Sequence, residues 1–371
     1  MNIGVDGRKL EKNKTGIGNY LDNIFRNLIN IDNHNQYFLF VNNREGVIYD
    51  AENVHIIEVA NPRFIKNEKL ASLVWLNISL IKEIKRKKID IFWGPNFLKP
   101  IFFPKKKSII TIHDLAFIEN KDQHSKIHSL YLKILLKLNI NKQIKILTVS
   151  EYSKSDILKI YDVPKENVYI TYCAIDNESN GNKSAVKLPD EYMLFVGTLE
   201  KRKNLNVIFE SLHYTKTNGG KILPLVVVGA KGNGLFEVKQ RIKDLSIEND
   251  IVFTGYVTDE ELNYIYSNAK LFIFPSFYEG FGIPLLEAMK FKVPIISSNR
   301  TSLPEVAANA AEYFSPDSPS ELSEKINLLM ENTARKNELV NSGIERINDF
   351  SWKKSAEVLC EAIKEVEGGN N

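Results

Sequence analysis

One short stretch of the chain combines two glutamates and two glycines in a pattern that could bind a phosphate. Glu279 precedes a turn that contains Gly280 and Gly282, and Glu287 follows eight positions after the first glutamate. Pro284 favours a helix start just after the turn, because its φ is already helical and its missing N–H costs nothing there. The glycines allow close backbone approach, and a helix start attracts anions. Two acids flank the turn, so we favour a phosphate-binding loop over an ordinary strand–turn–helix joint.

A basic pair forms a second candidate. Phe195–Leu205 has the pattern of a strand end, a glycine turn and a helix start, and Arg202 and Lys203 lie at that start. Cations at this position oppose the helix dipole, which suggests that an external anion binds them. Solvated surface charges are the alternative interpretation.

Two further loops carry residues suited to a ligand. Gly16 and Gly18 precede an amphipathic helix; the third glycine of a dinucleotide fingerprint is missing, so the loop either approaches a ligand or is a simple turn. His113 and Asp114 follow a strand-like run, and open α/β sheets bind ligands at the carboxyl ends of their strands. Ser150 is expected chiefly to cap the helix after it.

Several known site patterns are missing from the sequence. It has no Gly-x-x-x-x-Gly-Lys-[Ser/Thr] phosphate loop, no His-Glu-x-x-His zinc helix and no Asp-x-Asp metal pair. The two cysteines, Cys173 and Cys360, have no metal-ligand spacing, which favours buried thiols in a reducing cytoplasm. We therefore expect no metal and no resident cofactor.

The elements that must position these residues are short apolar runs separated by amphipathic helices. Continuous Val/Ile/Leu runs indicate parallel strands buried on both faces, and strand–helix alternation in two sets predicts two doubly wound, Rossmann-like α/β domains. The expected strands are Asn2–Asp6, Tyr37–Asn42, Val54–Val59, Ile89–Trp93, Ser108–His113, Lys145–Val149, Tyr192–Gly197, Leu225–Gly229, Ile251–Thr254, Leu271–Phe274 and Val293–Ser297.

Size and charge support two domains and show a basic first half. The chain has 371 residues, more than one core usually fills, and the polar stretch 176–184 is typical of a linker. Residues 1–180 hold 27 basic and 20 acidic side chains, and residues 61–110 hold 12 and 3. No apolar run is long enough to span a membrane, and the first residues do not have the pattern of a signal peptide.

The stretch from Phe274 to Met289 closely resembles the signature of the retaining GT-B glycosyltransferases of family 4, in which two glutamates are separated by seven residues. The resemblance covers almost the whole chain and weakens in residues 44–107 and in the tail. It implies a GT-B fold with an acceptor-side domain over 1–178, a nucleotide-sugar domain over 185–350 and a final helix, 351–371, that crosses back to the first domain. The family often has arginine directly after the glycine where this chain has Thr198, which leaves Arg202 to take over that role.

The resemblance also implies residue roles. The catalytic set would be Glu279, which contacts the hydroxyls of the transferred sugar, His113, which faces the sugar from the other domain, and Lys203, which holds the diphosphate with Arg202. Glu287 would bind the ribose. Donor binding would further involve Gly280, Phe281, Gly282 and Ile283 through backbone N–H groups, Val257 near the base, and the loop of Gly16 and Gly18.

The implied reaction transfers a hexose from a nucleotide-diphosphate sugar to an acceptor hydroxyl, with retention and without a metal. The motifs resemble mannosyltransferases of bacterial surface-polysaccharide assembly, so GDP-mannose is the favoured donor, with UDP- or dTDP-sugars as alternatives. A phosphorylase or epimerase on the same fold is the rival enzyme. A nucleic-acid-binding protein is disfavoured, because the lysines are not interleaved with aromatics and no recognition motif is present.

The acceptor is expected to be a glycan, lipid-linked in our interpretation. Phe97–Lys107 combines aromatic residues with a basic run, which suggests contact with an anionic membrane; a buried strand and loop with solvated lysines is the alternative. The expected location is the cytoplasm, with peripheral contact at the inner face of the membrane.

Overall fold

The computed structural model describes residues 1–11, 16–62, 65–119, 126–175, 187–230, 232 and 235–368. The chain divides into two compact units. Unit 1 comprises Met1–Cys173 and Ser351–Asn371, and unit 2 comprises Ala174–Phe350. The polar stretch 176–184, expected as a linker, lies outside the described residues.

Within its described residues, unit 1 is a seven-stranded parallel sheet in the order β3-β2-β1-β4-β5-β6-β7. Its strands are β1 (Asn2–Asp6), β2 (Gln36–Val41), β3 (Val54–Glu58), β4 (Ile91–Gly94), β5 (Ser108–Ile112), β6 (Lys145–Thr148) and β7 (Val168–Ile170). Its helices are α1 (Gly16–Ile31), α2 (Glu68–Val74), α3 (Leu80–Arg86), α4 (Ala116–Glu119), α5 (Lys126–Asn139), α6 (Glu151–Ile160) and α14 (Trp352–Gly368).

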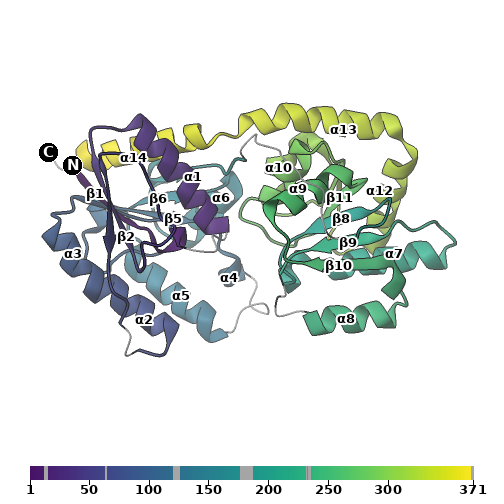
Figure 1. Ribbon diagram of the computed structural model, residues 1–371, viewed down its shortest axis with the longest axis horizontal. Helices are drawn as coiled ribbons and strands as arrows, with labels where there is room; N and C mark the ends of the chain where they lie inside the picture. The colour runs from purple at the N-terminus through teal and green to yellow at the C-terminus, as the bar shows by residue number, and fades with distance from the viewer. Residues whose placement is uncertain are drawn as a thin grey trace. The chain divides into compact units, whose positions relative to one another are not determined.

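Helices cover both faces of this sheet, which is why its central strands are apolar on both sides. Helices α1 and α14 pack together on one face, and α2, α3 and α5 lie on the other (Figure 1). The last helix is fixed in unit 1 by the Trp352 ring, 6.1 Å from the Tyr20 ring, and by a 2.6 Å hydrogen bond from the Ser355 hydroxyl to the Tyr172 carbonyl. The C-terminal segment thus completes the core of the unit that begins the chain.

The described part of unit 2 forms a six-stranded parallel sheet in the order β10-β9-β8-β11-β12-β13. Its strands are β8 (Met193–Val196), β9 (Leu225–Val228), β10 (Ile251–Gly255), β11 (Leu271–Phe274), β12 (Ile295–Ser298) and β13 (Ala311–Phe314). Its helices are α7 (Leu205–Thr217), α8 (Leu235–Asp244), α9 (Asp259–Asn268), α10 (Ile283–Lys290), α11 (Leu303–Ala307), α12 (Pro319–Glu331) and α13 (Thr333–Arg346).

One face of the second sheet packs on α7, α8 and α12 through a continuous apolar core, and α9 and α10 lie on the other side (Figure 1). Both sheets therefore have the doubly wound α/β architecture that the sequence predicts. All eleven expected strands are present, with ends shifted by no more than two residues. The structure adds two strands that the sequence reasoning missed, β7 and β13.

In each sheet the strand order reverses once along the chain. The reversal falls between β1 and β4 in unit 1 and between β8 and β11 in unit 2. The loops that leave the carboxyl ends of two such neighbouring strands diverge to opposite faces of the sheet, and the crevice between them is where open α/β sheets bind ligands. The topology thus selects one place in each unit for a site.

Candidate active site

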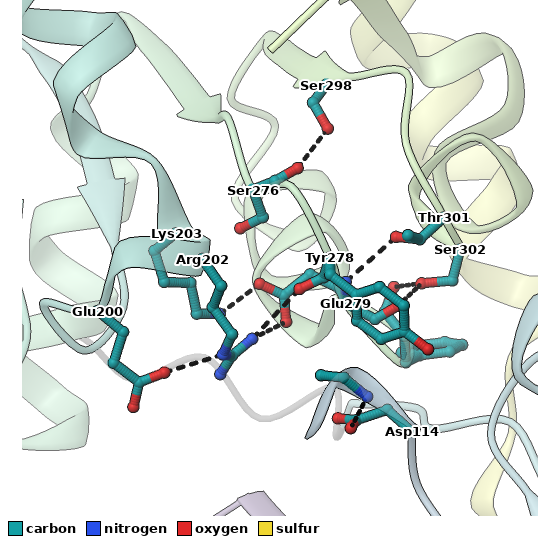
Figure 2. Close-up of polar contacts among 12 residues, drawn as sticks. Asp114, Glu200, Arg202, Lys203, Ser276, Tyr278, Glu279, Ser298, Thr301 and Ser302 are labelled. Carbon is teal, nitrogen blue, oxygen red and sulfur yellow. Dashed lines mark hydrogen bonds and ion pairs between the residues drawn. The ribbon is translucent and has the colours of Figure 1, made fainter. Parts of the chain in front are cut away.

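In unit 2, the reversal point brings together the three charged residues that the sequence singled out. The loop after β8 carries Arg202 and Lys203, and the loop after β11 carries Glu279. Lys203 Nζ lies 2.6 Å from one carboxylate oxygen of Glu279, and Arg202 Nη1 lies 3.0 Å from the other. Figure 2 shows both cationic groups pointing at this carboxylate. The sequence separates these residues by more than 70 positions, and only the pairing of β8 with β11 makes them neighbours.

The basic pair therefore has an internal anion, which the sequence analysis did not foresee. Its unfavourable position at a helix start was expected to imply an external anion, but Glu279 occupies it in this structure. Arg202 Nε is also 2.8 Å from the carboxylate of Glu200. Lys203 and Glu279 are both buried, whereas Arg202 and Glu200 are partly exposed to solvent. An external anion must consequently compete with a carboxylate already in place.

Burial and charge act in opposite directions on Glu279. Burial alone would raise the pKa of its carboxyl group, but the charges of Lys203 and Arg202 outweigh that effect and hold the pKa below its ordinary value. Glu279 is therefore ionised at neutral pH. The Lys203 ammonium also lies 5.1 Å from the centre of the Phe274 ring, an additional cation–π contact.

The backbone around Glu279 is held by two hydroxyl residues after β12. The Glu279 N–H donates to Thr301 Oγ1 at 3.1 Å, and the Ser302 hydroxyl lies 3.0 Å from the carbonyl oxygens of both Glu279 and Phe281. Figure 2 shows these contacts beside the loop. No site residue was predicted at these two positions. The available signal was a Thr-Ser pair that begins four residues after the end of the predicted Val293–Ser297 strand.

The glycine turn leads into α10 as the sequence predicts. Gly282 is the N-cap residue with φ +106°, and Pro284 lies in the first turn of the helix. No described side chain caps this turn, so backbone donors of Gly280–Ile283 lie at the positive end of the helix dipole. A side chain at position 282 would require a strained backbone, and its Cβ would lie 2.8 Å from Leu303 Cδ2.

Glu287 is the fifth residue of α10 and therefore lies one turn beyond the helix start. Its carboxylate accepts a 2.8 Å hydrogen bond from the Tyr266 hydroxyl of α9. Burial raises the pKa of the Glu287 carboxyl group, and the Tyr266 hydrogen bond offsets only part of that effect. The two signature glutamates therefore differ, because Glu279 has strong cationic partners and Glu287 has a neutral one.

The remaining unit 2 prediction concerns the turn between β10 and α9. Gly255 there has φ +72°, Val257 is buried, and Tyr256 between them is 84 % exposed. Thr258 caps α9 in a full capping box with Glu261, as its sequence position predicts. The exposed Tyr256 ring at the carboxyl edge of the sheet was not singled out, although an aromatic residue after a strand-end glycine was the available signal.

Unit 1 brings His113 close to the helix that follows the first glycine loop. Lys14 and Thr15 of that loop lie outside the described residues, Gly16 opens α1, and Gly18 is buried in its first turn. Two residues on, the Tyr20 ring meets the His113 ring edge-on at a centroid distance of 4.8 Å. His113 Nε2 lies 2.9 Å from the Pro95 carbonyl. A carbonyl only accepts, so Nε2 carries the proton and Nδ1 keeps its lone pair.

Burial lowers the pKa of His113 to about 4, and the ring is therefore neutral at physiological pH. A neutral imidazole can accept a hydrogen bond from a hydroxyl, but it adds no positive charge. The carboxylate of the next residue, Asp114, accepts a 3.1 Å hydrogen bond from the backbone N–H of Ala116. Ser150 caps α6 through a 3.0 Å bond from the Ser153 N–H, which confirms its expected role.

A polar cavity of about 470 Å³ lies at the reversal point of unit 1. Asp6 at the end of β1, Asn42 after β2 and Asn96 after β4 are among its lining residues. Arg8 makes a two-point ion pair with Asp6, at 2.6 Å and 2.9 Å, and its guanidinium lies 4.1 Å from the centre of the Trp75 ring. The Asn42 side-chain oxygen is buried without a hydrogen-bond partner among the described residues. This cavity could not be predicted from the sequence, because its lining residues come from four separate parts of the chain.

The segment Phe97–Lys107 exposes only part of the aromatic and basic surface that the membrane hypothesis describes, and contact with a membrane stays a prediction. Phe103 is buried, Phe97 packs against the core, and the Lys99 ammonium is buried and donates to the carbonyls of Pro100 and Phe103. Phe102 is 84 % exposed, Phe97 is partly exposed, and none of Lys105–Lys107 is buried. The segment is thus buried in part and exposed in part.

No group of three or more His, Cys, Asp or Glu side chains in the described ranges is arranged to hold a metal ion. No described helix is both long and apolar enough to cross a membrane.

Comparison with known proteins matches both halves of the chain to glycosyltransferase families. The family description "Glycosyltransferase Family 4" matches residues 14–179, and "Glycosyl transferases group 1" matches residues 176–346. The O-antigen chain mannosyltransferase B of Escherichia coli is 30 % identical over 74 % of each chain. The O-antigen chain mannosyltransferase RfbU of Salmonella typhimurium is 30 % identical over 57 % of this chain and 58 % of its own length.

Solved structures agree with the architecture. The sucrose-phosphate synthase of Thermosynechococcus elongatus aligns over 100 % of both chains with a TM-score of 0.77 at 14 % identity, a likeness that supports the fold alone. The chain belongs to glycosyltransferase family 4, and its two doubly wound units have the GT-B fold.

Proposed function

We propose that this glycosyltransferase transfers mannose from GDP-mannose to a hydroxyl of a lipid-linked glycan acceptor, with retention of the anomeric configuration. The observation that carries the proposal is the cluster of buried Lys203 and Glu279 with partly exposed Arg202 at the reversal point of unit 2. The choice of mannose rests on the two O-antigen mannosyltransferases that this chain resembles.

The cluster has the charges that the departing diphosphate requires. Two cations and the dipole of α10 act on one small volume, where burial strengthens their effect. A nucleoside diphosphate carries more negative charge than the single carboxylate of Glu279, so it can replace that carboxylate at Lys203 and Arg202. Glu279 then becomes available to accept hydrogen bonds from the sugar hydroxyls. Negative charge develops on the diphosphate in the transition state, and these preorganised groups stabilise it without a metal.

In the proposed reaction the acceptor oxygen forms a bond to the anomeric carbon as that carbon loses the diphosphate oxygen. The acceptor hydroxyl proton passes to the departing phosphate, and the products are the mannosylated acceptor and GDP. His113, neutral at physiological pH, accepts a hydrogen bond from a hydroxyl of the sugar. The exposed Tyr256 ring and the backbone at Val257 offer a flat apolar face for the base.

The polar cavity of unit 1 suits the acceptor. Its carboxylate, guanidinium and amide groups supply donors and acceptors together, which is what a sugar with several hydroxyls requires. The buried oxygen of Asn42 lacks a partner among the described residues, and a buried acceptor of this kind gains from a ligand hydroxyl. We therefore place the terminal sugar of the glycan at this cavity.

A thermal-shift panel of GDP, GDP-mannose, UDP-glucose, dTDP-glucose and ADP-glucose in EDTA tests the donor. A ligand that binds only the folded state adds about 2.7 kcal/mol at 100 times its Kd, so a bound nucleotide is easy to detect. We expect GDP and GDP-mannose to raise the melting temperature and the others to leave it unchanged. A rise with another nucleotide family, or a rise that needs added metal, would contradict the proposal.

We expect Glu287→Gln to weaken GDP binding without destabilising the ligand-free protein. The proposed ribose contact is a hydrogen bond to a carboxylate, and its loss should cost about 10–100-fold in affinity. The pKa of Glu287 is raised in the folded state, so its ionisation opposes folding once the pH exceeds the ordinary value. At pH 8 the melting temperature of the variant should be no lower than that of wild type. Any increase in melting temperature over wild type should disappear near pH 4.

Glu260→Gln is the matched control for that experiment. Glu260 lies exposed on the first turn of α9, so its neutralisation should lower the melting temperature only slightly, through the lost helix-dipole contact, and should leave GDP affinity unchanged. Calorimetric titration with GDP gives the comparison, and a Glu287→Gln protein that binds GDP as tightly as wild type would remove Glu287 from the donor site.

A further inference from the structure

Helix α5 exposes an apolar stripe to solvent. Leu130, Ile134 and Leu138 are 59 %, 52 % and 48 % exposed, and their four-residue spacing places them on one side of the helix. The opposite side is buried, with Leu135 and Leu136 in contact with the core of unit 1. Figure 1 shows α5 on the outside of unit 1, against one face of the sheet. The stripe is thus additional to the apolar face that the fold requires.

The charged residues of α5 itself are of one sign. The helix contains three lysines and no aspartate or glutamate. Two of the lysines, Lys133 and Lys137, alternate with the exposed apolar residues along the solvent side. Their long apolar stems can lie along such a surface while the ammonium groups reach out to phosphate.

A groove of about 660 Å³ extends this surface towards the end of α6. Lys133 and Lys137 form one wall, and Ile160 and Tyr161 contribute to the rest. At its edge Lys142 pairs with Asp162 at 3.1 Å, with both side chains largely exposed. The surface therefore combines apolar and basic groups beyond a single helix.

We propose that α5 lies in the plane of an anionic lipid surface, with Leu130, Ile134 and Leu138 inserted below the headgroups and Lys133 and Lys137 on the lipid phosphates. This pattern is that of interfacial amphipathic helices. A second copy of the chain fits less well, because a two-fold contact through α5 would bring its lysines against the same lysines of the copy. The inference deepens the proposed function, since it rests on a lipid-linked acceptor and states how the enzyme reaches it.

Sedimentation of the full chain with vesicles tests the proposal. One set of vesicles is phosphatidylcholine alone and the other contains 30 % phosphatidylglycerol. We expect binding to the anionic set only. Leu130→Gln/Ile134→Gln/Leu138→Gln should reduce it at least tenfold. Lys133→Gln/Lys137→Gln should reduce it about 25-fold at low salt, at roughly fivefold per lysine.

Lys82→Gln/Lys85→Gln is the matched control, because it removes two exposed lysines from α3 of the same unit. It should bind as wild type does, and all variants should keep the wild-type melting temperature and turnover with a lipid-free oligosaccharide acceptor. Equal binding by wild type and the triple variant, or no binding by wild type, would overturn the proposal. So would a dimer in light scattering that the triple variant abolishes, because a second copy would then occupy the stripe.

The two proposals fail independently. Vesicle binding is measured without nucleotide, and the thermal-shift panel is measured without lipid. If the protein bound anionic vesicles but did not respond to guanine nucleotides, the proposal for the α5 surface would stand and the proposal of GDP-mannose as donor would be wrong. If the protein responded to guanine nucleotides but did not bind anionic vesicles, the donor proposal would stand and the proposal for the α5 surface would be wrong.

Discussion

Replacing Lys203 with methionine should lower turnover about 10²–10³-fold, the usual loss when one preorganised charge contact to a developing anion is removed. Lys203 is buried, and its ammonium lies 2.6 Å from the Glu279 carboxylate, closer than the Arg202 guanidinium at 3.0 Å. Methionine keeps the apolar stem that lies beside Gly197, so the change removes the charge and its cation–π contact with Phe274 with little loss of packing. Turnover should fall more than donor affinity, because the charge acts most strongly in the transition state.

Lys201→Met is the control for this experiment. Lys201 belongs to the same short 3-10 helix, Lys201–Lys203, but its side chain is exposed. The measurement is steady-state release of GDP with acceptor present, together with a melting curve of each variant. If Lys203→Met turned over like Lys201→Met, the lysine would have no part in the reaction.

The sequence predicts the fold well because parallel sheets buried on both faces leave a strong local signal. Each of the eleven expected strands is a short run rich in β-branched and aromatic residues, and each is observed. The helix caps at Ser150 and Thr258 are equally local, since a hydroxyl bonds a backbone N–H three residues on. The glutamate and glycine pattern around Glu279 is also contained in one stretch of chain.

The two missed strands lack that signal. β7 has only three residues, and β13 reads Ala-Glu-Tyr-Phe, with two residues that strands disfavour. Glu312 of β13 is buried, and it is tolerated because Lys325 and Arg335 lie 2.8 Å and 2.7 Å from its two oxygens. Those partners come from α12 and α13, so the compensation is tertiary and cannot be read from the strand.

The residues of the site could be predicted from the sequence, but the contacts between them could not. Lys203 and Glu279 were both singled out, yet nothing local says that they neutralise each other. That contact follows from the pairing of β8 with β11, and sequence patterns do not give strand order. The same limit applies to Phe97–Lys107, where a pattern of aromatics and lysines resembled a surface although Lys99 and Phe103 are buried.

Glu279→Gln should separate binding from turnover. The substitution leaves Lys203 and Arg202 without their buried carboxylate, so GDP should bind at least as tightly as to wild type, because its phosphates no longer compete with Glu279. Turnover should nevertheless fall roughly 10²–10³-fold, since the charge that faces the sugar in the transition state is lost. Calorimetry with GDP and single-turnover kinetics with GDP-mannose measure the two effects.

The ligand-free variant should also be less stable, because an uncompensated buried cation costs about 3–5 kcal/mol. The pKa of Glu279 is lowered in the folded state, so its contribution is present above the ordinary value of about 4.3 and is lost as the pH falls through the folded value. The difference in melting temperature between wild type and variant should therefore persist at pH 7 and narrow only below about pH 4. GDP should restore much of the lost stability.

Glu200→Gln is the control for Glu279→Gln, because it also removes an acid that contacts the basic pair of Arg202 and Lys203. The Glu200 carboxylate pairs with Arg202 and its side chain is 42 % exposed, so its neutralisation should change stability and turnover little. If Glu279→Gln bound GDP more weakly than Glu200→Gln does, the carboxylate would be assisting the diphosphate rather than competing with it. The internal ion pair would then be part of the bound state, and the ligand-free cluster would already have the arrangement that the donor requires.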